Sequence, residues 1–451
     1  MKLFYGIRIL YHASTVLKSA SRTDRASPLG QARNCVLHFG RRVMAGLLFP
    51  LRRRERTEFL MIKSNRGAVR LFYLSAFLES LCFYAPVASL YRLEYGVSVF
   101  QITLIESVCF ILSLLLEMPW GFVTARVGYK KTLLAAGALE VLAAVLFWRA
   151  RGFGMFLAQR CVLAAAISGF SGCDVAYLCR LAGTEQEHRV VGGYNAVGYG
   201  GLVAVGLLFP LARPLGYRGL AFLALAGTLG SVLLRLALPE IGAEPQDTLG
   251  LKEQAAALKK VLLGNRPFLA FVLCGAVLTE VEHTFTVFFA SPAWAAAGIS
   301  EQWYGLLNLA LNLTGLAAGL CSARLARRAG PGRAVALCWA LALGCCCALA
   351  LGAGAAALLL ALPLLRLAAE SYRPFEQVFK NARTGCAGRA VALSAYNMAA
   401  SVTGAAVGPL LGAGTGEGLQ KGFAMGVCLL VPAALAAGIC YKRMQKGNRT
   451  Q

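Results

Sequence analysis

Four glutamates and one histidine stand inside long apolar stretches of this 451-residue chain: Glu79, Glu106, Glu140, Glu280 and His283. An ionisable side chain is costly in such surroundings, and it usually faces a water-filled cavity or a partner. A desolvated carboxyl group can exchange protons near neutral pH. We therefore interpret Glu79 as the first candidate for a proton-coupling or cation-binding group, with Glu106 and Glu140 next. A structural role for Glu79, hydrogen-bonded to a neighbouring helix, is the alternative.

Glu280 and His283 are three residues apart, so on a helix they share one face and predict a proton-binding pair. Glu282 points roughly opposite to both, which favours a structural role for it. Glu79 and Glu280 each lie about forty residues before a copy of a repeated hexapeptide. We therefore expect them at similar depth on opposite walls of a central cavity.

Other charged residues in apolar stretches have more local interpretations. Arg160 and Asp174 are fourteen residues apart, or ~21 Å along a helix, so they cannot pair with each other. Arg366 and Glu370, four apart, are expected to neutralise one another. Arg235 lies near the end of its apolar run, where its side chain would snorkel to the interface.

An internal repeat indicates the scaffold that positions these groups. The hexapeptide Gly121-Phe-Val-Thr-Ala-Arg126 returns in the same residue classes as Gly319-Leu-Cys-Ser-Ala-Arg324. Each copy closes a long apolar run and opens a basic turn. Two homologous membrane halves are a recurrent mark of secondary transporters, because two related bundles can rock around a shared site.

Apolar runs long enough to cross a bilayer predict an all-α integral membrane protein of twelve helices, six in each half, around a central cavity. A count of eleven is the alternative, because two runs merge around Gly352 and Gly354. The predicted spans are 69–91, 101–123, 132–148, 154–178, 190–211, 217–238, 267–290, 303–323, 334–350, 354–372, 390–413 and 420–441.

Composition and charge agree with a membrane protein. The chain is 58% hydrophobic with a mean hydropathy of +0.62, yet its net charge is +24. The basic residues gather in alternate loops, which by the positive-inside rule places both termini and those loops in the cytoplasm of a cell-membrane protein. Nucleic-acid binding is not expected, because the basic clusters are split among short loops. The outer loops carry only Arg92, Arg149, Arg151, Arg213, Arg218 and Lys421.

The chain divides into four parts. Residues 1–66 form a basic N-terminal extension without a spanning run, and Met61 is the favoured true initiator; an organelle transit peptide is the alternative. Residues 67–240 and 267–451 are the two halves, the second with a basic tail. Residues 241–266 form a cytoplasmic linker, whose stretch 249–263 is either an amphipathic surface helix or a solvated connection.

Neither metal nor enzymatic chemistry is indicated. Ten of the fifteen cysteines fall inside apolar spans, where they act as small hydrophobes, and no cysteine or histidine spacing predicts a zinc site. A membrane enzyme would need a loop-borne His, Asp or Ser cluster or a nucleotide-binding loop, and the chain has neither. We expect no cofactor, the proton gradient being the driving force.

The turn after the first repeat carries a recognisable signature. Gly121-x-x-x-Ala125-Arg126-Val127-Gly128-Tyr129-Lys130-Lys131 resembles the loop motif of the major facilitator superfamily, Gly-x-x-x-Asp-Arg-x-Gly-Arg-Arg/Lys. Three further stretches resemble a bacterial, drug- or metabolite-efflux-like branch of that family. They are Glu117-Met-Pro-Trp-Gly121, Ser171-Gly-Cys-Asp-Val-Ala-Tyr-Leu178 and Arg389-Ala-Val-Ala-Leu-Ser394. The similarity covers roughly residues 67 to 445.

The resemblance implies roles for several residues. Gly121, Arg126, Gly128 and Lys130 match the family's conformational-switch loop, and a simple topology anchor is the alternative. Ala125 stands where the family has an Asp that latches one access state, so a weakened or relocated gate is expected. Arg160 resembles the family's span-four arginine, which is linked to proton transfer. Packing or gating roles are expected for Asp174 and for Gly319 and Arg324 of the second copy.

These features predict a secondary active transporter that works by alternating access. We expect proton-coupled efflux of a small drug-like or metabolite substrate, because acids outnumber the Asn, Gln and Trp clusters typical of sugar sites. Proton-coupled uptake of a sugar, peptide or organic acid is the second candidate, and a membrane enzyme or sensor the third. The partners are a small-molecule substrate and the lipid bilayer. A monomer is expected, because the two halves already enclose a site.

Overall fold

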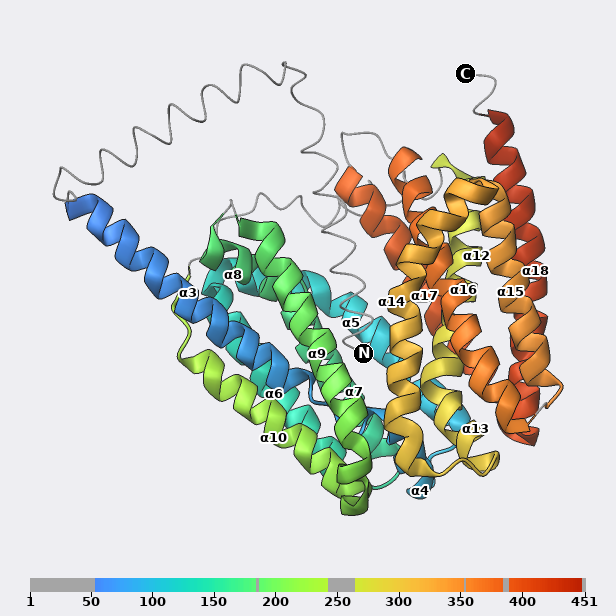
Figure 1. Cartoon of the computed structure of the whole chain (residues 1–451), viewed down its shortest axis with the longest axis horizontal. Helices are drawn as coiled ribbons and strands as arrows, with labels where there is room; N and C mark the ends of the chain where they lie inside the picture. The colour runs from blue at the N-terminus through green and yellow to red at the C-terminus, as the bar shows by residue number, and fades with distance from the viewer. Residues whose placement is uncertain (1–52, 184–185, 242–263, 353, 384–388, 448–451) are drawn as a thin grey trace.

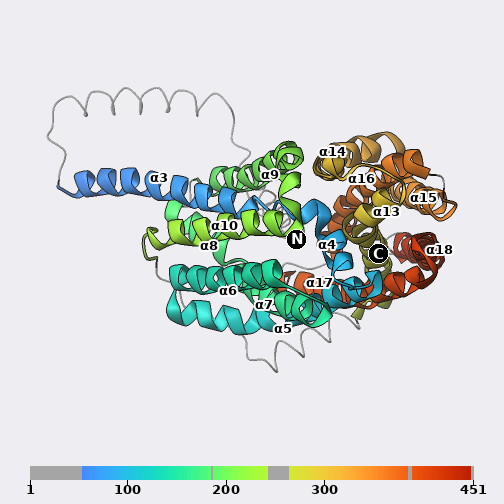
Figure 2. The same ribbon diagram turned by 90° about the horizontal axis from the view of Figure 1, so that it is seen from below.

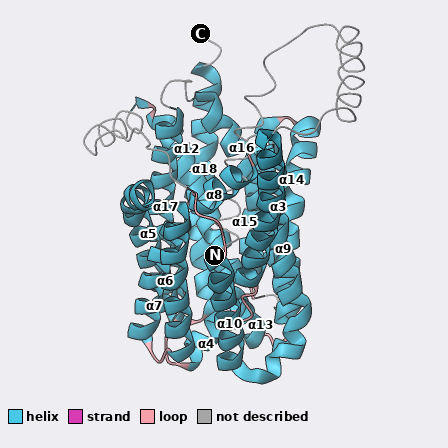
Figure 3. Cartoon of the chain, turned by 90° about the vertical axis from the view of Figure 1, so that its left-hand side faces the viewer, coloured by secondary structure: helices cyan, strands magenta, loops and turns pink. Residues whose placement is uncertain are grey.

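A computed structural model describes residues 53–183, 186–241, 264–352, 354–383 and 389–447. Within these ranges the chain folds into helices joined by short turns (Figure 3). The expected amphipathic stretch 249–263 and the proposed start at Met61 with its upstream segment fall outside the residues whose side chains are described.

The helices match the twelve expected spans. The first half contains α3 (Arg53–Ser80) with α4 (Ala88–Glu94), α5 (Val99–Val127), α6 (Tyr129–Arg149), α7 (Phe153–Phe170) with α8 (Cys173–Ala182), α9 (Glu187–Ala212) and α10 (Gly216–Leu236). The second contains α12 (Arg266–His283) with α13 (Ala290–Ala296), α14 (Tyr304–Ala329), α15 (Pro331–Ala350), α16 (Gly354–Arg383), α17 (Arg389–Ala413) and α18 (Leu419–Gly447).

Length and hydropathy alone give nine membrane-crossing segments among the described residues, or ten with α14, which is bent. One segment, Glu187–Leu236, contains both α9 and α10, and α17 supplies the remaining span. The doubtful boundary around residue 352 separates two helices, because Gly352 and Gly354 both adopt positive φ values that end one helix and start the next. Over the described parts of the chain the count is therefore twelve, not eleven.

Three spans are interrupted where the sequence suggested continuous helices. The first span leaves helical geometry after Ser80 and resumes in the short helix η2 (Ala85–Val87). The fourth breaks between α7 and α8, where Gly172 adopts a left-handed conformation. The seventh continues from α12 into a π-helical turn, η5 (Thr284–Phe289), before α13. Such irregular turns in membrane spans are tolerated where they line a cavity.

The twelve spans form two bundles of six. Figure 1 shows the α3–α10 bundle on one side and the α12–α18 bundle on the other, converging at the end that carries α4 and α13. Helix α17 packs against α5, and α14 packs against α9, across the boundary between the bundles (Figure 2). We call this end, with the turns at 95–98, 213–215, 297–300 and 414–418, the closed end.

Glycines allow the close crossings at the closed end. A Cβ at Gly206 of α9 would lie 2.8 Å from the Cβ of Leu309 of α14. A Cβ at Gly412 of α17 would lie 2.9 Å from the Cα of Phe100 of α5. In the pattern Gly404-x-x-x-Gly408-Pro409-x-x-Gly412, Gly408 and Gly412 thus face α5 of the other half, whereas Gly404 faces Glu280 of its own half, as expected for small residues where membrane helices pack closely.

One ion pair also joins the halves at the closed end. Arg213, in the turn η4 (Arg213–Leu215), lies 2.6 Å from a carboxylate oxygen of Glu301, in η6 (Glu301–Trp303) of the other half. The hydroxyl of Tyr217 donates to the same carboxylate at 3.0 Å. The two charged side chains are about 30% exposed, so we call this half-exposed contact the Arg213–Glu301 latch.

Replacing Glu301 by Gln is expected to loosen the closed end by a modest amount. A partly exposed ion pair contributes about 1 kcal/mol or less, so the open-to-closed ratio should shift by at most about fivefold. Hydrogen–deuterium exchange of the backbone around residues 299–309 measures this shift. Glu240→Gln, which removes the exposed Lys131–Glu240 pair outside this contact, is the matched control. Unchanged exchange in Glu301→Gln would show that the latch does not hold the halves.

Candidate transport site

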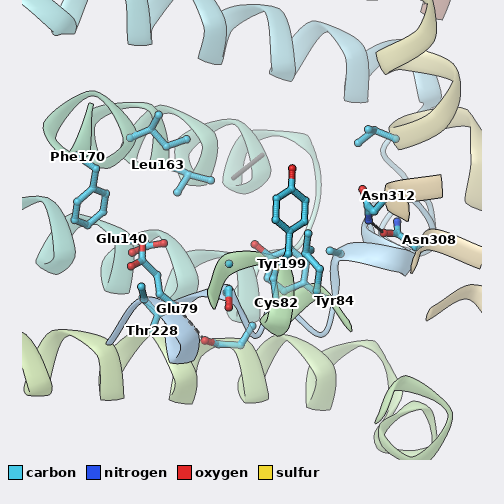
Figure 4. A pocket seen from close by; sticks show the side chains of 18 of the residues that line it. Glu79, Cys82, Tyr84, Glu140, Leu163, Phe170, Tyr199, Thr228, Asn308 and Asn312 are labelled. Atoms are coloured by element: carbon cyan, nitrogen blue, oxygen red, sulfur yellow. Dashed lines mark hydrogen bonds between the residues drawn. The ribbon is translucent and has the colours of Figure 1, made fainter. Parts of the chain in front are cut away.

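A cavity of about 310 Å³ lies between the two bundles, within the size range of small-molecule sites. It is lined from both halves, by α3, α6, α7, α9 and α10 on one wall and by α12, η5, α14 and α16 on the other. Figure 4 shows Glu79, Glu140, Tyr199, Asn308 and Asn312 among the side chains that surround it. Its charged lining residues are Glu79, Glu140, Asp174, Arg235, Glu282, His283, Arg366, Glu370 and Arg373.

Glu79 forms a buried ion pair on the first wall. Its carboxylate accepts a hydrogen bond from Arg235 of α10, and both side chains are at most 5% exposed. The expectation that Arg235 snorkels to the interface was wrong, because the Glu79 charge holds it inside. Arg235 also stacks on the ring of Phe170 at 4.8 Å and interacts electrostatically with Glu140.

Asp174 completes the acidic side of this wall. It lies in the first turn of α8, directly after the break in the fourth span, where it accepts a 2.7 Å hydrogen bond from the hydroxyl of Tyr194. Its other oxygen accepts from the backbone N–H of Val175. Among the residues that the structure describes, the first wall therefore carries three carboxyl groups, Glu79, Glu140 and Asp174, against the single guanidinium of Arg235.

The second wall contains a charge-balanced network. Arg366 of α16 donates to Glu282 at 2.9 Å and to the hydroxyl of Thr286 at 3.2 Å. Two turns further along α16, Arg373 lies 3.4 Å from Glu370. Arg366 thus pairs with Glu282 of another helix instead of Glu370, contrary to the sequence expectation, because the cross-helix carboxylate is within hydrogen-bond reach.

Glu282 is the structural counterpart of Glu79. The first span becomes irregular two residues after Glu79, and the seventh enters its π-helical turn two residues after Glu282. Each of these glutamates lines the cavity and pairs with an arginine of its own half. The sequence instead matched Glu79 with Glu280, because counting residues to the repeated hexapeptide cannot detect such helix irregularities.

Glu280 lies one layer behind the cavity wall. A Cβ at Gly404 of α17 would lie 2.9 Å from its carboxylate, and the hydroxyl of Thr284 donates to it at 3.2 Å. His283 lines the cavity, and its Nδ1 lies 3.7 Å from Glu280. The two residues come together as the spacing indicated, with only the histidine at the cavity surface.

Glu106 and Arg160 form a second buried pair in the first half. Their charged atoms are 2.7 Å apart between α5 and α7, and neither residue lines the cavity. Arg92 of α4 lies nearby, fully buried, with its guanidinium 5.8 Å from the ring centre of Phe147. This pair belongs to the interior of the first bundle.

The repeated turns lie at the opposite end from the closed end. Gly128 separates α5 from α6 with φ +90°, so the tight turn expected of it is present. Arg126 and Arg324 are exposed, and Lys130 is half-buried. A Cβ at Gly121 or Gly319 would meet no atom within 4 Å, so neither glycine mediates a close helix contact in this state.

Polar uncharged residues of the cavity were missed by the sequence analysis. Asn312 donates to Asn308 at 2.8 Å on α14, and Asn195, Gln159 and Tyr199 also line the cavity. One sequence pattern could have predicted part of this polar lining: Asn308 and Asn312 are four residues apart, which places both amides on one helix face. Their gathering with residues of α7 and α9 depends on the tertiary fold.

Comparison with solved structures supports the architecture. The nucleoside transporter NupG is 16% identical, with a TM-score of 0.67 over 83% of this chain and 98% of that one. A bacterial homologue of the human lysosomal transporter Spinster, in an inward-facing and unoccupied conformation, gives 0.66 at 15% identity over 86% and 98%. A D-xylose–proton symporter gives 0.62 at 15% over 82% and 96%.

Sequence comparison identifies the family. No curated protein matches the chain. The family model of the Major Facilitator Superfamily matches residues 71–409, which is three quarters of the sequence and includes most of both bundles. With its two six-helix halves around a charged cavity, this multi-pass membrane protein belongs to the Major Facilitator Superfamily of transporters.

Proposed function

We propose that this transporter is a proton-coupled exporter of a small cationic or amphipathic molecule. The observation that supports it is the acidic first wall, where three carboxyl groups face one guanidinium in a buried setting. An excess of buried negative charge requires neutralisation by a proton or a cation. A substrate cation and a proton would therefore compete for the same wall, and this competition couples their movements in opposite directions.

Glu79, Glu140 and Arg235 have distinct parts in this proposal. Arg235 forms an ion pair with Glu79, so its electrostatic interaction with Glu140 is the weaker of the two. Protonation of Glu140 would reduce the excess on this wall from two negative charges to one and release a bound cation. The Glu280–His283 pair could pass protons at the second wall, because His283 borders the cavity.

We further propose that the basic turns face the cytoplasm, with both termini on that side of the cell membrane. The closed end carries few basic residues and the opposite end many, which supports this orientation. The described conformation would then be closed to the outside. The chain would work as a monomer, since one copy encloses the cavity, and residues 67–240 and 267–451 would move against each other around the linker 241–266.

Proton-coupled uptake of a neutral polar substrate is the second candidate. The amides of Asn195, Asn308, Asn312 and Gln159 favour it, because they can hydrogen-bond hydroxyl groups or heterocycles. Two of the structural neighbours are described as a nucleoside transporter and a sugar–proton symporter. The two functions differ in whether proton and substrate move in opposite directions or together.

Reconstitution of the full chain into vesicles with an internal pH dye tests the proposal. An imposed pH gradient should drive an organic cation against the proton flow, and addition of that cation should dissipate the gradient. Glu140→Gln should lose this coupling by at least tenfold, since it removes one of the two excess negative charges and the proposed site of protonation. Proton flow in the same direction as a sugar or nucleoside, with no response to cations, would contradict export and favour uptake.

A further inference from the structure

Three arginines at the closed end lack a carboxylate partner. Among the basic residues there, Arg213 pairs with Glu301, Lys421 pairs with Glu417, and Arg92 is buried beside Glu106 and Arg160. Arg149, Arg151 and Arg218 are exposed, and within the described ranges none of them has a carboxylate oxygen within 4 Å. These three guanidinium groups therefore carry positive charge that no described carboxylate pairs with directly.

The three arginines surround one pocket. Trp148, Arg149, Arg151 and Arg218 line a cavity of about 260 Å³, separate from the central cavity, which we call the arginine pocket. Its walls come from the end of α6, the turn before α7 and the first turn of α10. The guanidinium of Arg149 lies 5.4 Å from the ring centre of Trp148, and that of Arg218 lies 5.3 Å from the ring centre of Tyr95. Stacking on these aromatic rings helps to hold two of the guanidinium groups in place.

The chemistry of the pocket selects a phosphate group. Guanidinium groups match phosphate oxygens by paired, charge-assisted hydrogen bonds, and three of them supply more positive charge than a carboxylate requires. Trp148 lies at a span end, where tryptophan prefers the membrane–water interface. Basic residues at the level of the head groups attract anionic lipids. The N-terminus of α7 adjoins the pocket, and its Gly152 cap offers no side-chain acceptor to the first backbone N–H groups.

We propose that the arginine pocket binds a phosphate group, carried either by an anionic phospholipid or by a soluble phosphate ion. Bound there, the phosphate would bridge α6, α7 and α10 and neutralise their three cations. Arg218 follows Tyr217, whose hydroxyl bonds to Glu301 of the other half. Occupation of the pocket would therefore steady the first turn of α10 beside the Arg213–Glu301 latch.

The test compares two variants that remove the same charge from opposite ends of the protein. Arg149→Gln, Arg151→Gln and Arg218→Gln are combined in one full-length chain. The control combines Arg327→Gln, Arg328→Gln and Arg333→Gln, three exposed arginines of the turn between α14 and α15. Native mass spectrometry counts phosphatidylglycerol retained from mixed phosphatidylcholine vesicles, and equilibrium dialysis measures inorganic phosphate binding to delipidated protein in detergent.

Wild type and control should bind the phosphate group, and the pocket variant should bind it about 100-fold more weakly, or about fivefold per arginine. Retention of phosphatidylglycerol without phosphate binding identifies the lipid as the ligand, and the reverse identifies the soluble ion. Equal retention and equal binding by wild type and the pocket variant, or no binding by wild type, would overturn the proposal. If the triple variant fails to fold, Arg218→Gln alone should still lose about fivefold.

Discussion

Replacing Arg235 by Ala is expected to abolish transport and to destabilise the protein by about 3–5 kcal/mol, because it leaves a buried carboxylate without its partner. Arg235 is 1% exposed, and its guanidinium pairs with Glu79 and interacts electrostatically with Glu140. Its loss leaves three carboxyl groups on one wall with no cation. Thermal unfolding in detergent measures the stability, and pH-driven flux in vesicles measures transport.

A double change separates the ion pair from general packing. Arg235→Ala with Glu79→Ala removes both charges, so it should recover part of the lost stability while transport stays low. Lys131→Ala, which breaks the exposed pair with Glu240, is the control and should change the stability by less than about 1 kcal/mol. If Arg235→Ala were as stable and as active as Lys131→Ala, the buried pair would have no part in folding or transport.

Replacing Gly412 by Val should prevent the two bundles from approaching at the closed end. Its Cβ would lie 2.9 Å from the Cα of Phe100, and it would also meet the hydroxyl of Thr103. Backbone atoms cannot move aside as a flexible side chain can. Overpacking of this kind costs about 1–3 kcal/mol, which would reduce the closed population and the transport rate by about tenfold or more.

A matched glycine provides the control for this prediction. Gly344 is an exposed helical glycine of α15 with nothing within 4 Å of its Cβ position, so Gly344→Val should transport at the wild-type rate. Hydrogen–deuterium exchange around residues 96–104 should rise in Gly412→Val and remain unchanged in Gly344→Val. Wild-type transport by Gly412→Val would show that this crossing is not needed during the cycle.

The span pattern was predictable from sequence because hydropathy and the bilayer thickness set it. Each of the twelve spans has a helical counterpart in the structure. The repeated hexapeptide correctly indicated that the spans divide into two halves of six. The partners of the buried charges were not predictable. Glu79 and Arg235 are 156 residues apart, and Glu282 and Arg366 are 84 apart, so only the packing of distant spans brings them together.

Local spacing served well only where both residues occupy one regular helix. It predicted the proximity of Glu280 and His283, and it failed for Arg366 and Glu370, where a third residue on another helix competes. It also failed to identify Glu282 as a cavity residue. Glu280, Glu282 and His283 all belong to α12, and the side of that helix that faces the cavity depends on how α12 packs against α16 and α17, which spacing along one helix does not indicate.

Glycine contacts, the Arg213–Glu301 latch and apolar packing join the halves at the closed end. A carrier that works by alternating access has to break these contacts in every cycle, so the conformation closed at this end should lie within a few kcal/mol of its opposite. A difference of about 1.4 kcal/mol leaves roughly one molecule in ten in the minor state. The substrate then needs only a small preference for one state to redirect the whole population. A small energy difference between the two states would therefore let the carrier turn over quickly instead of resting in one conformation.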